Sequence, residues 1–203
     1  GEGKYRQVAE LLKEARKPLI FVGGGAKDAG DEVREVAERL KAPVTYSLMG
    51  KGVLGDEHPL NIGMIGMHGT GAANYAVAEC DVMLAVGVRF DDREPGDEAN
   101  FATGARIIHL DIDRKEFNKN VRNTLSLHDD SAVGLFKLLK IIRDEEYSHQ
   151  DHWIQQIAGW QEKHPLTYAR SGAIKPQEVM EAINAASQGR AYVATDVGQH
   201  QMW

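Results

Sequence analysis

Apolar residues recur at helical spacing in three segments of the chain, over 5–16, 31–40 and 130–143. The expected buried faces of the first two consist of Val8, Leu11, Leu12 and Ala15, and of Val33, Val36, Ala37 and Leu40. The expected buried face of the third consists of Val133, Phe136, Leu139 and Ile142. A further helix is expected over 71–80. Each periodic segment is predicted to place one side in a core.

Short apolar runs without polar alternation stand between these helices, over 18–23, 43–46, 81–86 and 105–110. An apolar run of this kind predicts a strand that is covered on both faces. Strands of this kind that alternate with amphipathic helices predict an α/β fold with a doubly wound sheet. We expect six strands, mainly parallel, with helices on both faces.

The pattern changes after the last of these helices. Residues 146–172 are polar with scattered aromatic residues, and we interpret them as a linker. Beyond them, 176–187 begins with proline and has helical spacing, and "AYVAT" at 191–195 is strand-like. One helix and one strand cannot close a core, so 173–203 is interpreted as the truncated start of a second domain. The first domain is expected over 1–145.

A parallel sheet binds ligands where its strands end, which directs attention to the residues after each apolar run. Gly23, Gly24 and Gly25 follow the first run directly. Glycines there let backbone amides approach a ligand, and a following helix would favour a phosphate. A tight strand-to-helix turn explains the same glycines, and the residues leave both interpretations open.

Two further stretches are glycine-rich or densely charged. "GMIGMHGTGAANYAVAECD" places His68 in a glycine-rich loop, which suits close contact with a planar or phosphorylated ligand. Local hydrogen bonding is the commoner role of such a histidine, and no ligand spacing indicates a metal site. "VGVRFDDRE" combines arginines that suit phosphate or carboxylate with neighbouring acids. The alternative for that cluster is a group of surface salt bridges.

Two carboxylates follow the apolar run at 105–110. Asp111 and Asp113 stand in "HLDIDR", where an acid at a strand end commonly accepts hydrogen bonds from ribose hydroxyls. Asp113 has a second explanation, as the cap of a short helix.

Composition narrows the function classes. A net charge of −6 without a cluster of Lys and Arg argues against a nucleic-acid or acidic-membrane partner. The single cysteine, Cys80, excludes an internal disulfide and a cysteine-based zinc site. No signal pattern or apolar run of membrane length occurs, so a cytoplasmic location is expected.

Taken in order, several stretches resemble the acetolactate synthase (acetohydroxyacid synthase) family of thiamine-diphosphate enzymes. The stretches are "GGG", "LMGKG", "HPLNIGMIGMHGT", "ANYAVAECDVMLAVGVRFDDR", "IIHLDID" and "TDVGQHQMW". The chain departs from the family pattern where Glu94-Pro95 replaces Val-Thr, and where Arg114 replaces proline.

The resemblance implies a subunit of three domains whose central, Rossmann-like domain binds FAD. It implies condensation of two pyruvates, or of pyruvate and 2-oxobutyrate, with release of CO2 in branched-chain amino-acid synthesis. Thiamine diphosphate and Mg²⁺ are the implied cofactors, with the metal ligands outside this chain. A homodimer, and in some cases a regulatory small subunit, are the implied partners. The chain on its own is expected to be inactive.

The resemblance also assigns residues. Those implied to contact FAD are Gly23, Gly24, Gly25, Leu48, Met49, Met67, His68, Gly69, Gly87, Arg89, Asp91, Asp111, Ile112 and Asp130. Arg93 is implied to hold the carboxylate of the second 2-oxoacid, with Asp92 orienting it. Gly198, Gln199 and His200 are implied to lie nearest thiamine diphosphate.

Two alternatives stay open, a flavin-free thiamine-diphosphate decarboxylase of 2-oxoacids and a nucleotide-binding regulatory module. A sirtuin-like deacylase is excluded because its zinc site needs four cysteines. A nicotinamide dehydrogenase is disfavoured, because no GxGxxG precedes an acid by about 20 residues.

Overall fold

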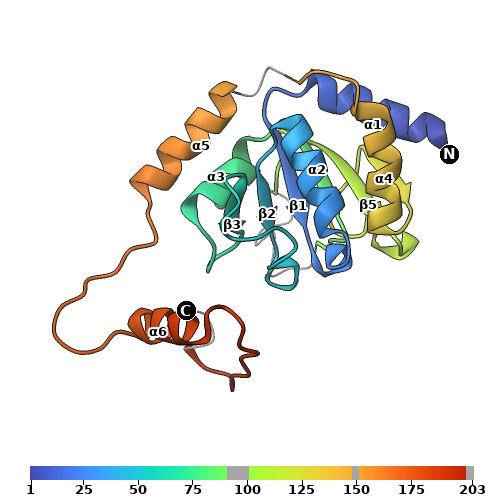
Figure 1. The fold of residues 1–203 in the computed structure, drawn as a ribbon. Helices are drawn as coiled ribbons and strands as arrows, with labels where there is room; N and C mark the ends of the chain where they lie inside the picture. Colours follow the sequence, from blue (N-terminus) through green and yellow to red (C-terminus); the bar gives the residue numbers. More distant parts are fainter. Residues whose placement is uncertain (91–100, 148–150, 200–203) are drawn as a thin grey trace. The chain divides into compact units, whose positions relative to one another are not determined.

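The computed structural model describes residues 1–90, 101–147 and 151–199. These residues form two compact units, Gly1–His164 and Pro165–Trp203. The predicted sheet lies in the first unit, with helices on both sides of it (Figure 1).

The sheet has six strands, and every adjacent pair is parallel. The strands are β1 (Pro18–Val22), β2 (Val44–Tyr46), β3 (Asn61–Met64), β4 (Val82–Val86), β5 (Arg106–Asp111) and β6 (Leu125–His128). Their order across the sheet is β3-β2-β1-β4-β5-β6. The predicted α/β class with a doubly wound sheet is therefore confirmed, and the winding direction reverses between β1 and β4.

Helices cover the two faces of this sheet. They are α1 (Glu2–Glu14), α2 (Gly30–Leu40), α3 (Gly71–Glu79), α4 (Ser131–Ile142) and α5 (Asp151–Lys163). Buried residues of α1, α2 and α4 share one hydrophobic cluster, and those of α3 and α5 share another. Among the described residues, no helix is long and apolar enough to cross a membrane.

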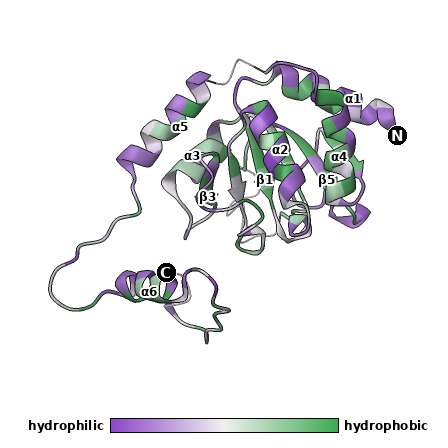
Figure 2. Ribbon diagram, in the orientation of Figure 1, coloured by the Kyte–Doolittle hydropathy of each residue, from purple (hydrophilic) through white to green (hydrophobic). Residues whose placement is uncertain are grey.

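Side chains of β1 show how one strand supplies both clusters. Ile20 and Val22 belong to the cluster beneath α1, α2 and α4, whereas Leu19 and Phe21 belong to the cluster beneath α3 and α5. Successive side chains of a strand point to opposite faces, so a continuous apolar run is what a doubly covered strand requires. In Figure 2, β1 and β5 are accordingly mainly hydrophobic, and the helices carry both colours.

The predicted faces of two helices compare differently with the structure. In α2 the four expected residues, Val33 to Leu40, are all buried. In α4 the expectation was wrong in part, because Val133 and Phe136 are exposed. Gly134 lies on the buried side instead, where an added methyl group would stand 2.6 Å from Leu110 Cδ1. The absence of a side chain at Gly134 lets the helix approach β5 closely.

The stretch interpreted as a linker contains α5, and this helix packs on the first unit. Trp153 is fully buried, and its Nε1 donates a hydrogen bond to the carbonyl oxygen of Pro18 at 2.9 Å. Trp160 lies against Tyr75 of α3, with 5.4 Å between ring centroids. The compact unit therefore extends to His164, beyond the boundary expected at 145.

The second unit contains α6 (Pro176–Ser187), which begins with proline as expected. Residues 191–195, expected to form a strand, adopt no strand, and Tyr192 and Val193 are exposed. A strand needs a neighbouring strand for its backbone hydrogen bonds. None is present among the described residues of this unit.

Candidate functional site

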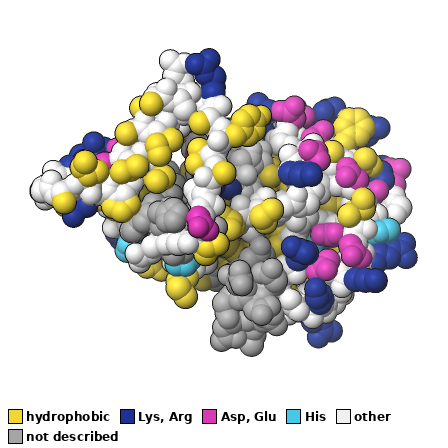
Figure 3. Space-filling model, turned by 90° about the horizontal axis from the view of Figure 1, so that it is seen from below, with side chains coloured by type: hydrophobic (Ala, Val, Ile, Leu, Met, Phe, Trp, Pro, Cys, Tyr) yellow, Lys and Arg dark blue, Asp and Glu magenta, His cyan; other side chains and the backbone are white. Residues whose placement is uncertain are grey.

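The point at which the strand order reverses defines the candidate site. In a doubly wound sheet, ligands bind outside the carboxyl ends of the two strands at this point. Here those strands are β1 and β4, and their carboxyl ends meet at the lower edge of the sheet in Figure 1. In the view from that side, the first unit carries hydrophobic side chains among charges of both signs (Figure 3).

Three glycines join the turns that follow β1 and β4. The Gly25 amide donates to the Gly87 carbonyl oxygen at 3.0 Å. A methyl group added at Gly23 would lie 2.4 Å from that same oxygen, and one at Gly25 would lie 2.7 Å from Gly87 Cα. Gly87 itself has φ +60, a conformation that favours glycine. The close approach that these glycines allow is thus between two segments of the protein.

Gly24 differs from its neighbours, because an added methyl group would meet a side-chain atom, Met49 Cβ, at 3.1 Å. Met49 belongs to the short 3-10 helix Leu48–Gly50 after β2. The glycine turn and this helix therefore stand side by side at the carboxyl edge.

Four large apolar side chains at this edge are exposed to solvent. They are Leu48, Met49, Met67 and Ile112, with exposed fractions of 67%, 71%, 92% and 69%. They follow β2, β3 and β5. Removing apolar surface from water is favourable by about 25 cal/mol per Å², so a ligand that covers these side chains would bind more tightly.

Asp111 ends β5 and is nearly buried. Its Oδ1 accepts a hydrogen bond from the Asp113 amide at 2.8 Å, and its Oδ2 lies 3.8 Å from His109 Nε2. Burial acts to raise the pKa of Asp111, but the His109 imidazole and the backbone amides that follow outweigh burial and lower it. The carboxylate is therefore held ionised at the end of β5.

Asp130 and Asp113 cap helices. Asp130 Oδ1 accepts hydrogen bonds from the Ala132 and Val133 amides at the start of α4. Asp113 accepts one from the Lys115 amide. Directly after Asp130, Ser131 Oγ donates to the Gly25 carbonyl oxygen at 2.9 Å, which ties α4 to the glycine turn.

The charged stretch after β4 is described only in part. Arg89 is exposed, between buried Val88 and Phe90. Asp91, Asp92 and Arg93 lie outside the described residues.

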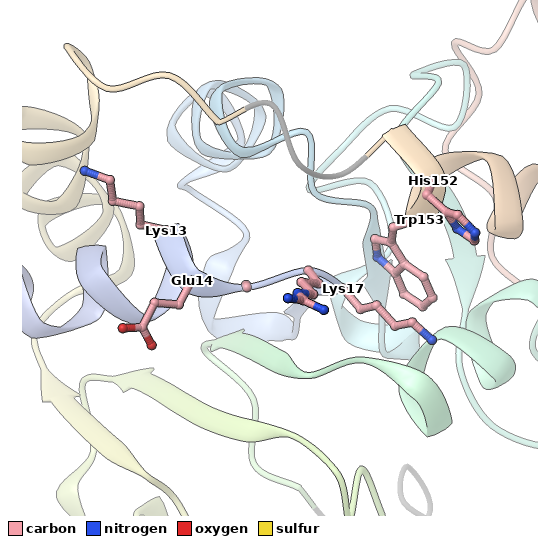
Figure 4. Close-up of a pocket in the computed structure, with 7 residues that line it drawn as sticks. Lys13, Glu14, Lys17, His152 and Trp153 are labelled. Atoms are coloured by element: carbon pink, nitrogen blue, oxygen red, sulfur yellow. The ribbon is translucent and has the colours of Figure 1, made fainter.

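A separate cavity of about 510 Å³ lies where the strands begin, at the end of α1 and the start of α5 (Figure 4). The ammonium groups of Lys13 and Lys17 point in opposite directions there. Lys13 pairs with Glu145 at 3.2 Å, and Lys17 pairs with Glu79 at 3.0 Å. Each of these two lysines is thus engaged by a carboxylate, and their ammonium groups do not converge on the cavity.

Comparison with known proteins identifies the family to which this architecture belongs. Residues 5–138 match the family model described as the thiamine pyrophosphate enzyme, central domain. The chain belongs to the thiamine pyrophosphate enzymes. The match covers all six strands, so the carboxyl edge described above is that of a thiamine pyrophosphate enzyme central domain.

Individual thiamine pyrophosphate enzyme relatives are similar over nearly the whole chain. The acetolactate synthase large subunit of Parasynechococcus marenigrum is 43% identical over 198 residues, 96% of this chain and 32% of the relative. That of Haemophilus influenzae is 40% identical, over 100% of this chain and 36% of the relative. Acetolactate synthase 1 of Oryza sativa is 41% identical, over 97% and 31%. The chain thus spans about a third of the length of these relatives.

Two of the residues assigned to thiamine diphosphate are described. Gly198 is part-exposed and Gln199 is exposed, both after α6 in the second unit, and His200 lies outside the described residues. In the described part of this thiamine pyrophosphate enzyme chain, no group of three or more His, Cys, Asp or Glu could hold a metal ion.

Three residues that the sequence analysis did not single out shape the carboxyl edge. They are His109, which lies beside Asp111, Ser131, which holds the glycine turn, and Asn74, which contacts the loop after β3. Their residue types are common in ordinary helices and strands. Only the contacts formed in the fold distinguish them.

Proposed function

We propose that this chain is the central part of an acetolactate synthase large subunit and that its first unit binds FAD. The observation that carries the proposal is the switch-point edge, where Arg89, Asp111 and exposed apolar side chains gather. About 40% identity to acetolactate synthase large subunits supports it. Residues 173–203 then begin the domain that binds thiamine diphosphate.

The residues at the edge fit the parts of a flavin dinucleotide. The Arg89 guanidinium suits a phosphate, and the ionised Asp111 suits ribose hydroxyls. Exposed Leu48, Met49 and Met67 suit an apolar ring system, because burying them would gain free energy. Gly24, His68, Gly69, Ile112 and Asp130 would add backbone and side-chain contacts around these groups.

The proposed reaction joins two pyruvates, or pyruvate and 2-oxobutyrate, and releases CO2. Thiamine diphosphate, when bound, supplies the electron sink for the decarboxylation. In this chain Gly198, Gln199 and His200 would hold that cofactor, and Mg²⁺ would be held by residues elsewhere in the subunit. Arg93 would hold the carboxylate of the second 2-oxoacid, oriented by Asp92. We further propose a homodimer of complete subunits, a regulatory small subunit as a partner, and a cytoplasmic location.

The proposal is tested by calorimetric titration of the 203-residue chain with FAD and with ADP, its adenine half. We expect both to bind, and Arg89→Ala to weaken both about tenfold, since a hydrogen-bonded charge contributes about 1.5 kcal/mol or more. Arg34→Ala is the matched control, an exposed arginine on α2. Equal binding by Arg89→Ala would remove Arg89 from the site.

The same titration separates the alternatives. Binding of ADP without FAD would favour a flavin-free decarboxylase or a nucleotide-binding module. Binding of neither ligand would overturn the proposed flavin site.

A further inference from the structure

Asn74 of α3 binds both backbone polar groups of one residue, Gly66, in the loop that follows β3. Its Oδ1 accepts a hydrogen bond from the Gly66 amide at 2.9 Å, and its Nδ2 donates to the Gly66 carbonyl oxygen at 2.9 Å. Nδ2 also lies 3.1 Å from the carbonyl oxygen of Thr70. One carboxamide therefore satisfies both polar groups of Gly66 and reaches the far end of the loop.

The gripped residue lies at the start of the exposed tip of the loop. Gly66 has φ +98, which favours glycine, and it leads directly into Met67 and His68, both exposed. The Thr70 amide returns to the Met64 carbonyl oxygen at 2.9 Å and closes the base of the loop. Within the tip, the Gly69 amide donates to the Gly66 carbonyl oxygen at 3.1 Å. Gly66 is therefore the point from which the tip is oriented.

The helix itself does not require Asn74. The N-terminus of α3 is already capped by Thr70 Oγ1, which accepts from the Ala73 amide at 3.1 Å. Asn74 is exposed and fills no core space. Asparagine inside a helix is less favourable than alanine by about 0.5 kcal/mol, so its contribution at this position comes from the loop contacts.

We infer that Asn74 is a positioning residue of the proposed flavin site: its carboxamide holds the N–H and the carbonyl oxygen of Gly66 and so fixes Met67 and His68 at the carboxyl edge. The inference rests on the proposed function, which assigns that edge to FAD. Asn74 does not contact the ligand in this account. Because Asn74 already orders the loop in the free protein, the loop loses less conformational entropy when the ligand binds.

Two variants separate this role from a general structural one. Asn74→Ala removes all three contacts and leaves a good helix former. Asn74→Asp keeps the acceptor for the Gly66 amide but places an oxygen opposite the Gly66 and Thr70 carbonyl oxygens. Glu79→Ala is the control, because Glu79 is an exposed residue of the same helix that binds Lys17 and Gln156 rather than the loop.

The experiment measures amide hydrogen exchange at Gly66–Gly69 without ligand, FAD affinity by calorimetry, and the melting temperature of the 203-residue chain. We expect exchange in the loop to accelerate on the order of tenfold and the FAD Kd to rise about fivefold to tenfold in both Asn74 variants. The melting temperature should stay close to that of the wild type. Glu79→Ala should leave loop exchange and FAD affinity unchanged.

Each other outcome is decisive. Unchanged exchange in Asn74→Ala would show that the carboxamide does not hold the loop. Faster exchange with unchanged FAD affinity would show that the loop is held but does not serve the flavin. Loss of FAD affinity together with a large fall in melting temperature would assign Asn74 a general structural role. If the wild type binds no FAD, the proposed function fails, and the link between Asn74 and the flavin fails with it.

Discussion

His109 Nε2 donates a hydrogen bond to the carbonyl oxygen of Val88 at 2.8 Å, in a part of the molecule closed to solvent. The ring lies edge-on to Phe90 and Phe117, with centroids 5.1 and 5.2 Å away. This contact joins β5 to the segment that leads from β4 to Arg89. It thereby links the two charged residues assigned to the dinucleotide, Arg89 and Asp111.

Replacing His109 by leucine should destabilise the first unit by about 1–3 kcal/mol, because the buried Val88 carbonyl loses its donor. Glutamine carries an amide donor at a similar reach and should recover about half of that loss. Urea unfolding followed by circular dichroism gives both values. Equal stability of the leucine variant and the wild type would contradict the stated role of the bond.

Replacing Trp153 by alanine should cost about 3–5 kcal/mol, the usual range for a buried aromatic residue. The side chain fills space beside the sheet, and its indole N–H donates a hydrogen bond to the carbonyl oxygen of Pro18. Trp160→Ala, at a part-exposed position of the same helix, should cost clearly less. If both variants unfold at the wild-type urea concentration, α5 does not contribute to the first unit.

Asp129 should make stability depend on pH. Its Oδ2 accepts from Tyr5 Oη at 2.6 Å, and Lys137 Nζ lies 2.8 Å from the same oxygen. Burial acts to raise the pKa of Asp129, but the hydrogen bonds from Lys137 and Tyr5 outweigh it and lower the pKa. A lowered folded-state pKa stabilises the protein above the ordinary value near pH 4, and this contribution declines as the pH falls through the folded-state value.

Asp129→Asn should accordingly be less stable than the wild type by about 1–2 kcal/mol at neutral pH. The difference should shrink as the pH approaches roughly 3. Urea titrations at a series of pH values measure it. A difference that stays constant down to that pH would exclude Asp129 as the source.

In a catalytically active subunit that contains this chain, Arg93→Ala should raise KM for the 2-oxoacid or lower kcat. A charged hydrogen bond contributes about 1.5–3 kcal/mol, which corresponds to roughly tenfold to a hundredfold in kcat/KM. Steady-state kinetics and a melting curve are both needed. Unchanged kinetics with a lower melting temperature would make Arg93 a member of a structural ion pair.

Hydrophobic pattern predicted most of the sheet, but two edge strands were not located. β3 contains Asn61 and Gly63, and Gly63 has φ +98, so the segment lacks the apolar run that marks a central strand. β6 reads "LSLH" and is only partly buried. Edge strands have one neighbour each, and their sequences are correspondingly less apolar.

Helix faces were predictable where no small residue intervened. The spacing in α2 had one solution, whereas α4 offered two, and Gly134 decided between them by its contact with Leu110. A glycine inside a helical pattern marks either a weak position or a close approach. The chain alone does not say which. The segment around Trp153 was interpreted as a linker for another reason: it is polar, and the buried residues of α5 are only Trp153 and Ile157.

In the candidate site, too, some features could be predicted from the sequence and others could not. Strand ends were predicted from apolar runs, and the parallel topology brings them to one edge. The contacts of Asn74 and His109 were out of reach, because they join residues 8 and 21 positions apart through side-chain geometry. Such pairings depend on how the turns pack, which spacing along the chain does not encode.

The interlocked glycines of the β1 and β4 turns separate architecture from ligand preference. Gly23, Gly25 and Gly87 have no room for any other side chain, so these turns tolerate no exchange. The exposed Leu48 and Met67 carry no such constraint. Evolution, or a designer, can therefore change what this edge binds by altering only the exposed side chains, while the interlocked glycine turns stay invariant.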